Sequence, residues 1–568
     1  MEQREREGED EPDDSDGRRG TTQEGGHAVI MGPRRVVSQG AGWTRPLRRL
    51  AIVLATGGAL TACAGGPVQD AIVFASGADL ESANPLVTIH PLARQVQRHV
   101  LFVTLTRLDS SLAPQPYLAR RWSWSGDGRT LTLSLHPGLR WHDGAPTTAR
   151  DVAFTFRAAQ DPATGFPRAP EVAGIDTIMV LDDSTLAMRW SHPPPGLPLI
   201  LSELPIVPEH LLRDVPRSDF RRHAFSTAPV GNGPWRFVQR DPGRRWIFHR
   251  VEDFPAAMGG PAQSNRVVVA VVDEATTKFA GLASGDLHVA GIAPGMATLV
   301  DADPALRVLS YPVNFSTTLV FNSARPPFDD ARVRRAVSAL VNRQRIIEVA
   351  LAGYGVPADG PVAASHPYAI ALPRLTSAQA DSLLSAAGWL LEDGLRRRGG
   401  EPLRFTLLSV GSGDNAIEQL LQADLRAVGI AMEIRQLELG AFLAAARRTP
   451  RDFDALFTGI GGDLALSHLV AMFDSRLAGG ALDYAGFHTA QLDSLYDALA
   501  RATTDSSVAA TWAAIQRELH REMPVAWIYH ARGVQGVSRR LTGARMDLRG
   551  EMATLAAWRL DPGASGTP

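Results

Sequence analysis

The 568-residue chain contains almost no cysteine and almost no lysine. Cys63 is its only cysteine and Lys278 its only lysine, so 57 of the 58 basic residues are arginine. A single thiol excludes an intrachain disulfide and a thiolate metal cluster. The phosphate-binding loop of P-loop nucleotide hydrolases needs a lysine after a glycine-rich turn. Lys278 instead follows two threonines, which excludes that class.

The chain also lacks a strong charge of either sign and lacks long apolar runs. From residue 70 onward it holds 49 basic and 50 acidic residues, and 45% of the whole chain is hydrophobic. A nearly neutral surface argues against nucleic acid as a partner. After residue 69 no apolar run approaches 18 residues, so we expect a soluble globular body. About 500 residues exceed a single core and predict two or three domains.

Sequence motifs of hydrolases are missing as well. The chain contains neither the Gly-x-Ser-x-Gly of a nucleophile elbow nor the His-Glu-x-x-His of a zinc protease. The pair His142-Asp143 could serve acid–base chemistry, but we interpret it as part of a structural turn. We therefore expect no enzymatic activity, no metal site and no cofactor.

Cys63 follows a segment typical of a secretion signal. Arg45, Arg48 and Arg49 precede the apolar run 50–60, and the segment ends in Leu60-Thr61-Ala62-Cys63. The run is too short to span about 30 Å of hydrocarbon as a helix. Its ending resembles a bacterial lipobox, which implies diacylation of the Cys63 thiol and stable anchoring. We predict an exported periplasmic or cell-envelope protein tethered to a membrane; a buried core cysteine is the alternative.

The first 30 residues do not suit a position before such a signal. They hold ten acidic residues, four arginines and almost nothing apolar, so this leader should be disordered. No acidic residue occurs between Met31 and Gln69. We expect translation to start at Met31, with 1–30 as an extension of the gene model; a translated disordered leader is the alternative.

Hydrophobic periodicity divides the remaining chain into two kinds of segment. Up to residue 318 strands and turns dominate, as in 71–76 and in the alternating run 129–136. From residue 319 strands and helices alternate, and 403–437 reads as a strand, a helix and a second strand. Such a unit implies parallel strands. An apolar strand at 523–529 follows the last helices.

Several short motifs follow one another along the chain in a fixed order. They are Leu118-Ala119-x-x-Trp122, Leu139-Arg140-Trp141-His142-Asp143-Gly144, Thr148-Ala149-x-Asp151-Val152, Gly231-x-Gly233-Pro234-Trp235 and Pro327-Phe328-Asp329-Asp330-x-Arg332-Val333-Arg334. This set, behind a lipobox, resembles family 5 extracellular solute-binding proteins, which are dipeptide, oligopeptide and nickel receptors of ABC importers. The resemblance covers about residues 71–558.

The resemblance implies an α/β fold of the periplasmic-binding-protein-like class II, with two lobes in three domains. After the leader and signal (1–63), a discontinuous domain I comprises 64–105, 206–312 and 523–568. Domain II comprises 106–205 and domain III 313–522. The chain crossings between the lobes are expected to act as hinges.

The resemblance also places the ligand between the lobes. Residues expected to border it are Asn84, His90, Asn314, Ser316, Gly459, Ile460, Gly461 and Asp463. In dipeptide receptors an aspartate in the loop that corresponds to 458–463 pairs with the α-amine of the ligand. A buried ammonium needs such a partner. Here the aligned residue is Ile460, so either Asp463 takes that role or the ligand has no free amine there. Asp463 as a solvated loop residue is equally open, and Trp235 and Trp389 are expected in the core.

These expectations combine into a lipid-anchored, monomeric receptor of an ABC importer. It would capture peptides by lobe closure, deliver them to permease subunits and catalyse no reaction. One alternative is an exported hydrolase of peptide-like or glycan substrates. Another is a non-transport peptide sensor or chaperone that uses the same cleft.

Overall fold

The structure is a computed structural model that describes residues 71–88, 90–411 and 415–561, all within one compact unit. The lipobox with Cys63 and the acidic leader lie outside the described residues. Within the described ranges, no helix combines the length and apolar character needed to cross a membrane.

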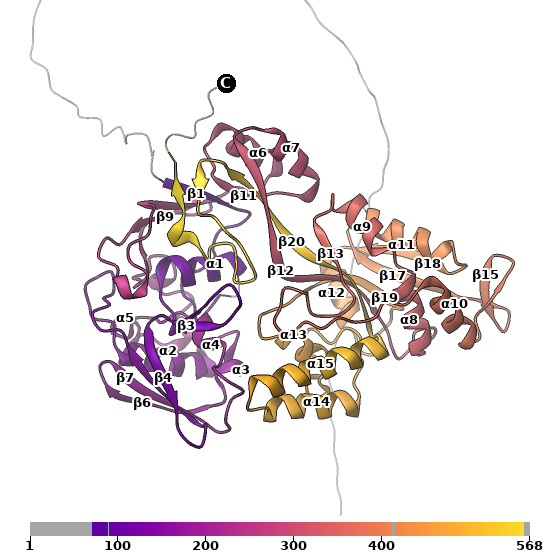
Figure 1. The fold of residues 1–568 in the computed structure, drawn as a ribbon, viewed down its shortest axis with the longest axis horizontal. Helices are drawn as coiled ribbons and strands as arrows, with labels where there is room; N and C mark the ends of the chain where they lie inside the picture. Colours follow the sequence, from indigo (N-terminus) through magenta and orange to yellow (C-terminus); the bar gives the residue numbers. More distant parts are fainter. Residues whose placement is uncertain (1–70, 89, 412–414, 562–568) are drawn as a thin grey trace, which may run out of the picture. The chain divides into compact units, whose positions relative to one another are not determined.

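One large mixed sheet forms the centre of the fold (Figure 1). Its strand order is β18 (Ala431–Leu437), β17 (Arg404–Val410), β19 (Ala455–Gly461), β12 (Leu306–Phe321), β20 (Val525–Ser538), β11 (Val289–Gly291), β1 (Ala71–Ser76), β10 (Arg266–Val271), β9 (Arg245–Arg250) and β8 (Trp235–Asp241). A short strand, β13 (Gly355–Pro357), also pairs with β20. The sheet therefore joins strands from both ends of the sequence.

The two long strands β12 and β20 run side by side at the middle of this sheet (Figure 1). They pair antiparallel from Leu306–Ser538 to Val320–Val525. The register shifts between Pro312, opposite Arg532, and Ser316, opposite His530. Three residues of β12 thus face one residue of β20, and such an irregularity bends a strand and re-aims its side chains.

Alternating strands and helices form the part of the sheet beyond β12. β17 and β18 pair in parallel through α11 (Ala416–Arg426), which confirms the predicted unit at 403–437. Two side chains of types that favour helix starts cap helices here: Asp330 caps α8 (Ala331–Leu340), and Thr376 caps α10 (Ser377–Ala386). The other helices here are α9 (Arg343–Ala350), α12 (Leu439–Arg447), α13 (Ser467–Phe473), α14 (Ala490–Arg501) and α15 (Asp505–Glu522).

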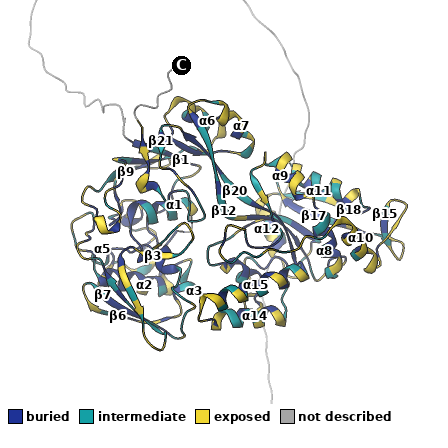
Figure 2. Cartoon of the chain, viewed as in Figure 1, coloured by how far each residue is buried: buried dark blue, intermediate teal, exposed yellow. Residues whose placement is uncertain are grey.

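The N-terminal part contains a second, antiparallel sheet of four strands. Its order is β4 (Ala119–Trp124), β5 (Thr130–Leu135), β7 (Thr185–Trp190) and β6 (Ile175–Asp182), and α2 (Ala149–Gln160) contacts it. Leu131, Leu133 and Leu135 of β5 are buried, as their alternation predicts. Figure 2 shows the contrast between buried strands and exposed helical faces, most clearly on α10 and α14.

Two expectations about elements differ from the structure. The apolar spacing of 92–105 suggests one helix, but α1 (Pro91–Val96) continues only as a π-helical turn (Gln97–Leu101). The carbonyl of Leu101 accepts the N–H groups of Asn232 and Gly233, so a tertiary contact ends the helix. The apolar strand expected at 523–529 extends to Ser538 as β20 and pairs with β12 along this extension. The glycines at 533 and 536 leave room there for the Tyr311 ring and the Leu282 side chain.

Glycine at 233 is required by a close approach of two backbone segments. A Cβ placed there would lie 2.6 Å from the carbonyl oxygen of Val100 and from the carbonyl carbon of Leu101. Backbone atoms cannot move aside as a flexible side chain would, so the turn cannot accept a larger residue without displacing the helix end.

Gly233→Ala is expected to lower the free energy of unfolding by about 1–3 kcal/mol, because it overpacks this contact. The urea midpoint should fall while the slope of the transition stays unchanged. Gly126→Ala is the matched control, because a Cβ there meets nothing within 4 Å. Equal midpoints for the two variants would contradict the proposed clash.

Candidate functional site

A cavity of about 540 Å³ opens where the register of β12 and β20 shifts. Its walls come from the end of β1, the loop and helix at 90–98, α6 (Ala275–Ser284), residues 311–314 of β12, the loop 462–464, Gln535 of β20 and the segment 547–551. This volume lies within the range of ordinary small-molecule sites, roughly 300–1,000 Å³. We name this cavity the central pocket.

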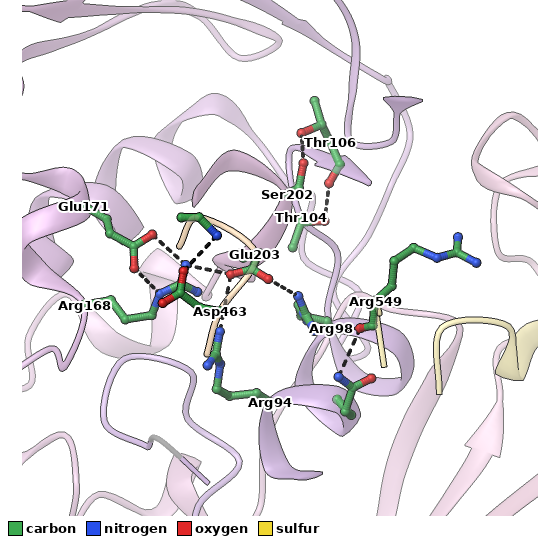
Figure 3. Close-up of polar contacts among 12 residues, drawn as sticks. Arg94, Arg98, Thr104, Thr106, Arg168, Glu171, Ser202, Glu203, Asp463 and Arg549 are labelled. Carbon is green, nitrogen blue, oxygen red and sulfur yellow. Dashed lines mark hydrogen bonds and ion pairs between the residues drawn. The ribbon is translucent and has the colours of Figure 1, made fainter. Parts of the chain in front are cut away.

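A buried ionic network forms one wall of the central pocket. Glu203, at the end of α4 (Ile200–Glu203), is contacted by Arg98 at 2.9 Å, Arg168 at 2.6 Å and Arg94 at 3.4 Å. In Figure 3 these three guanidinium groups converge on the single carboxylate. Burial alone would raise the pKa of Glu203, but the three cations hold it below its ordinary value. Arg168 also pairs with Glu171, so every charged group in this wall has a partner and the network carries one excess positive charge.

Hydroxyl groups fix the position of α4 behind this network. The Ser202 hydroxyl lies 2.7 Å from that of Thr106, and the Thr104 hydroxyl donates to the carbonyl of Thr106 at 2.6 Å (Figure 3). Arg98 also donates to the carbonyl of Arg549, whose own side chain pairs with Asp547 at 2.6 Å. The wall is thus built from several distant segments held rigidly together.

Two charged side chains on the pocket wall have no ion-pair partner among the described residues. Lys278 on α6 is half-buried, and no hydrogen bond to its ammonium group occurs within that part of the chain. Glu551 accepts a hydrogen bond from the Tyr311 hydroxyl at 2.7 Å but contacts no cation there. The central pocket therefore offers a ligand one side chain of each charge that has no direct ion-pair partner among the described residues.

The predicted site residues divide into two groups. His90, Asn314 and Asp463 line the central pocket. The other residues lie in the surrounding structure: Asn84 is fully buried, Ser316 contacts His530 at 2.8 Å, and Gly459, Ile460 and Gly461 pair with β12 inside the sheet. Ile460 belongs to a hydrophobic core, and Gly459 lies under the Phe315 ring.

Asp463 is fully engaged at the start of α13. Its carboxylate accepts from the N–H groups of Ala465, Ser467 and His468 and from the Ser467 hydroxyl. Burial alone would raise the pKa of Asp463, but the contacts with His468 and Ser467 hold it well below its ordinary value. This carboxylate therefore stabilises the first turn of a helix.

Asp463→Asn should lower the free energy of unfolding by about 1 kcal/mol at pH 7, because it removes the charge from these hydrogen bonds. A lowered pKa gives stability above the pKa of the unfolded chain, and that stability is lost as the pH falls through the folded value. The difference from the wild type should therefore shrink below about pH 4, measured by urea unfolding across pH.

Asp176→Asn, at an exposed position of β6, serves as the control and should show almost no difference at any pH. A difference for Asp463→Asn that stays constant down to pH 2 would show that the charge of Asp463 contributes nothing.

The residues in which the sequence suggested chemistry make contacts within the protein that serve its structure. His142 lies with its Nε2 3.0 Å from the carbonyl of Gly233, and burial lowers its pKa to about 4. Asp143 pairs with His210 at 2.8 Å. Trp235 and Trp389 are buried in hydrophobic cores, as expected. Among the described residues, no group of three or more His, Cys, Asp or Glu is arranged to hold a metal ion.

Sequence reasoning missed several residues of the central pocket, among them Arg94, Lys278, Tyr311, Gln535 and Glu551. Only Lys278 carried a signal, because it is the single lysine of the chain. The others come from segments that meet only after β20 has paired with β12.

The large mixed sheet is built around two long paired strands, β12 and β20, with a polar pocket beside their register shift. This fold is that of the periplasmic binding proteins. Residues 113–475 match the family described as bacterial extracellular solute-binding proteins, family 5 Middle. The chain belongs to this family, which confirms the predicted resemblance and fold class.

Individual relatives agree with this assignment. Protein XP55 of Streptomyces lividans is 27% identical over 90% of this chain and 96% of its own. The nickel-binding periplasmic protein of Escherichia coli is 26% identical over 68% of this chain and 76% of its own. The structure of the oligopeptide-binding protein AppA of Bacillus subtilis with a nonapeptide has a TM-score of 0.68 at 21% identity. It covers 87% of this chain and 99% of AppA, and at this identity shows the fold alone.

Proposed function

We propose that this protein is the substrate-binding component of an ABC importer and that its ligands are peptides. The observation that carries this proposal is that Lys278 and Glu551, two side chains of opposite charge on the wall of the central pocket, have no direct ion-pair partner among the described residues. A short peptide carries an ammonium and a carboxylate at its two ends, so it can compensate both charges at once. Curated relatives that are named as peptide-binding proteins support the same choice.

The proposed mechanism is capture without chemical change. Domain I would comprise 64–105, 206–312 and 523–568, domain II 106–205 and domain III 313–522. β12 and β20 would then connect domains I and III, with the register shift at Pro312–Ser316 next to the ligand. Hinges are a few residues that absorb large backbone changes, and an irregular stretch of strand suits that role. The ligand would pass intact to permease subunits.

Native mass spectrometry of the protein as purified tests the proposal. We expect bound species whose masses and fragments are those of intact short peptides, and their removal should expose the pocket. Because Lys278 is the only lysine, acetylation by an N-hydroxysuccinimide ester reports on the pocket at one side chain. Lys278 should be acetylated several-fold more slowly in the liganded protein than in protein that was unfolded, stripped and refolded.

The acetylation rate of the chain's own α-amino group is the internal control and should not change. A metal chelate or a sugar in place of peptides would overturn the peptide assignment. Cleavage of added peptides by the purified protein would instead favour the exported hydrolase.

We propose further that the protein is exported, acylated at Cys63, held at the membrane as a monomer and periplasmic or cell-envelope in location. The support is the basic stretch, the apolar run and the Leu-Thr-Ala-Cys ending. Two acyl chains are enough for stable anchoring, whereas one gives only reversible binding.

Cys63→Ala should move most of the protein from the detergent phase to the aqueous phase in Triton X-114 partitioning of expressing cells, because it removes the acylated thiol. Ser38→Ala, upstream in the same segment, should partition like the wild type. If Cys63→Ala remained in the detergent phase, the anchor would have to lie elsewhere.

A further inference from the structure

Glu551 is a carboxyl group that has no direct ion-pair partner among the described residues. It lies on the wall of the central pocket and contacts Tyr311 and Gln535, both of which are uncharged. The nearest charges along its own segment are already matched, because Arg549 pairs with Asp547 at 2.6 Å. Burial raises the pKa of Glu551, and no cation lowers it. A half-buried carboxyl group without an ion-pair partner is costly, so its presence in a pocket calls for an explanation.

The hydrogen bonds around Glu551 fix which groups remain unsatisfied. The Tyr311 hydroxyl has one proton and donates it to Glu551 at 2.7 Å, so its oxygen can act only as an acceptor. Gln535 must therefore turn its NH₂ group toward that oxygen, at 3.2 Å, and toward Glu551, at 3.4 Å. The carbonyl oxygen of the Gln535 amide then has no hydrogen-bond partner within the described part of the chain, although this residue is only 4% exposed.

At Glu551 and Gln535 the pocket thus presents hydrogen-bond acceptors that lack donors among the described residues. The Glu551 carboxylate has spare lone pairs, and the Gln535 carbonyl oxygen is an orphan acceptor. A ligand that completes this arrangement must bring several N–H donors and a positive charge. A primary ammonium has three donors and no acceptor, which matches this need.

We propose that Glu551, with Gln535 beside it and Tyr311 as its positioning residue, binds the ammonium group of the ligand. This inference rests on the proposed function, in which that group is the free N-terminus of a peptide. It also replaces the expectation for Asp463, whose carboxylate already accepts four hydrogen bonds from its own loop and helix. The aligned alternative, Ile460, is apolar and buried.

The proposal is tested with two probes, an equimolar mixture of random tripeptides and the same mixture N-acetylated. Binding to stripped full-length protein is measured by calorimetry and native mass spectrometry at pH 7.5. The wild type should bind the free mixture at least tenfold more tightly, because hydrogen bonds to a charged group are strong and an amide cannot replace an ammonium. Glu551→Gln should remove this preference, and Tyr311→Phe should reduce it.

Folding of the variants is checked independently. Glutamine keeps the shape of Glu551 and can still accept from Tyr311, so ligand-free Glu551→Gln should melt at or above the wild-type temperature. Glu433→Gln, at an exposed position of β18, changes the net charge equally and should keep the full preference for free peptides.

The outcomes separate the two proposals. Equal wild-type affinity for free and acetylated peptides, or an undiminished preference in Glu551→Gln, would overturn the role of Glu551 and leave the peptide receptor intact. Failure of the wild type to bind either mixture would overturn the proposed function and this inference with it.

Discussion

The pairing of β12 with β20 is the constraint on which the rest of the structure depends. These strands lie more than 200 residues apart in the sequence, yet they are neighbours along most of their length. Their pairing brings together the end of β1, the helix at 91–96 and the segment 547–551 around one pocket. The shift in their register supplies the irregular stretch that turns Tyr311 and Asn314 toward that pocket. A regular ladder would alternate these side chains between opposite faces of the sheet.

The charges around the pocket divide by whether the protein compensates them itself. Glu203 has three arginines, Asp547 has Arg549, and Asp463 has the first turn of α13. Such groups give rigidity and have little left to offer a ligand. Lys278 and Glu551 are different, because the described residues supply no opposite charge for them. A binding site gains affinity when the ligand supplies the opposite charge for such a group. The ligand-free protein is less stable as a result.

Local structure could be predicted from the sequence, and long-range contacts could not. The caps at Asp330 and Thr376 and the alternation in β5 depend on neighbouring residues, so the sequence indicates them directly. The early end of the helix after residue 91 depends on the turn at Gly233, which no local pattern reveals. His90, Asn314 and Asp463 were predicted from the positions that border the ligand in the family, whereas the resemblance assigned no ligand contact to Gln535 and Glu551. The domain boundaries and the roles of individual site residues stay predictions.

The central position of β20 has a consequence for the order of assembly. During synthesis, β1, β10 and β11 emerge early, and β12 follows well before residue 525. Until β20 arrives, β11 and β12 each present an unpaired edge, and open edges invite association with other chains. The N-terminal half therefore cannot complete its sheet until residues 525–538 are available. Chaperones that shield strand edges are accordingly most needed in that interval.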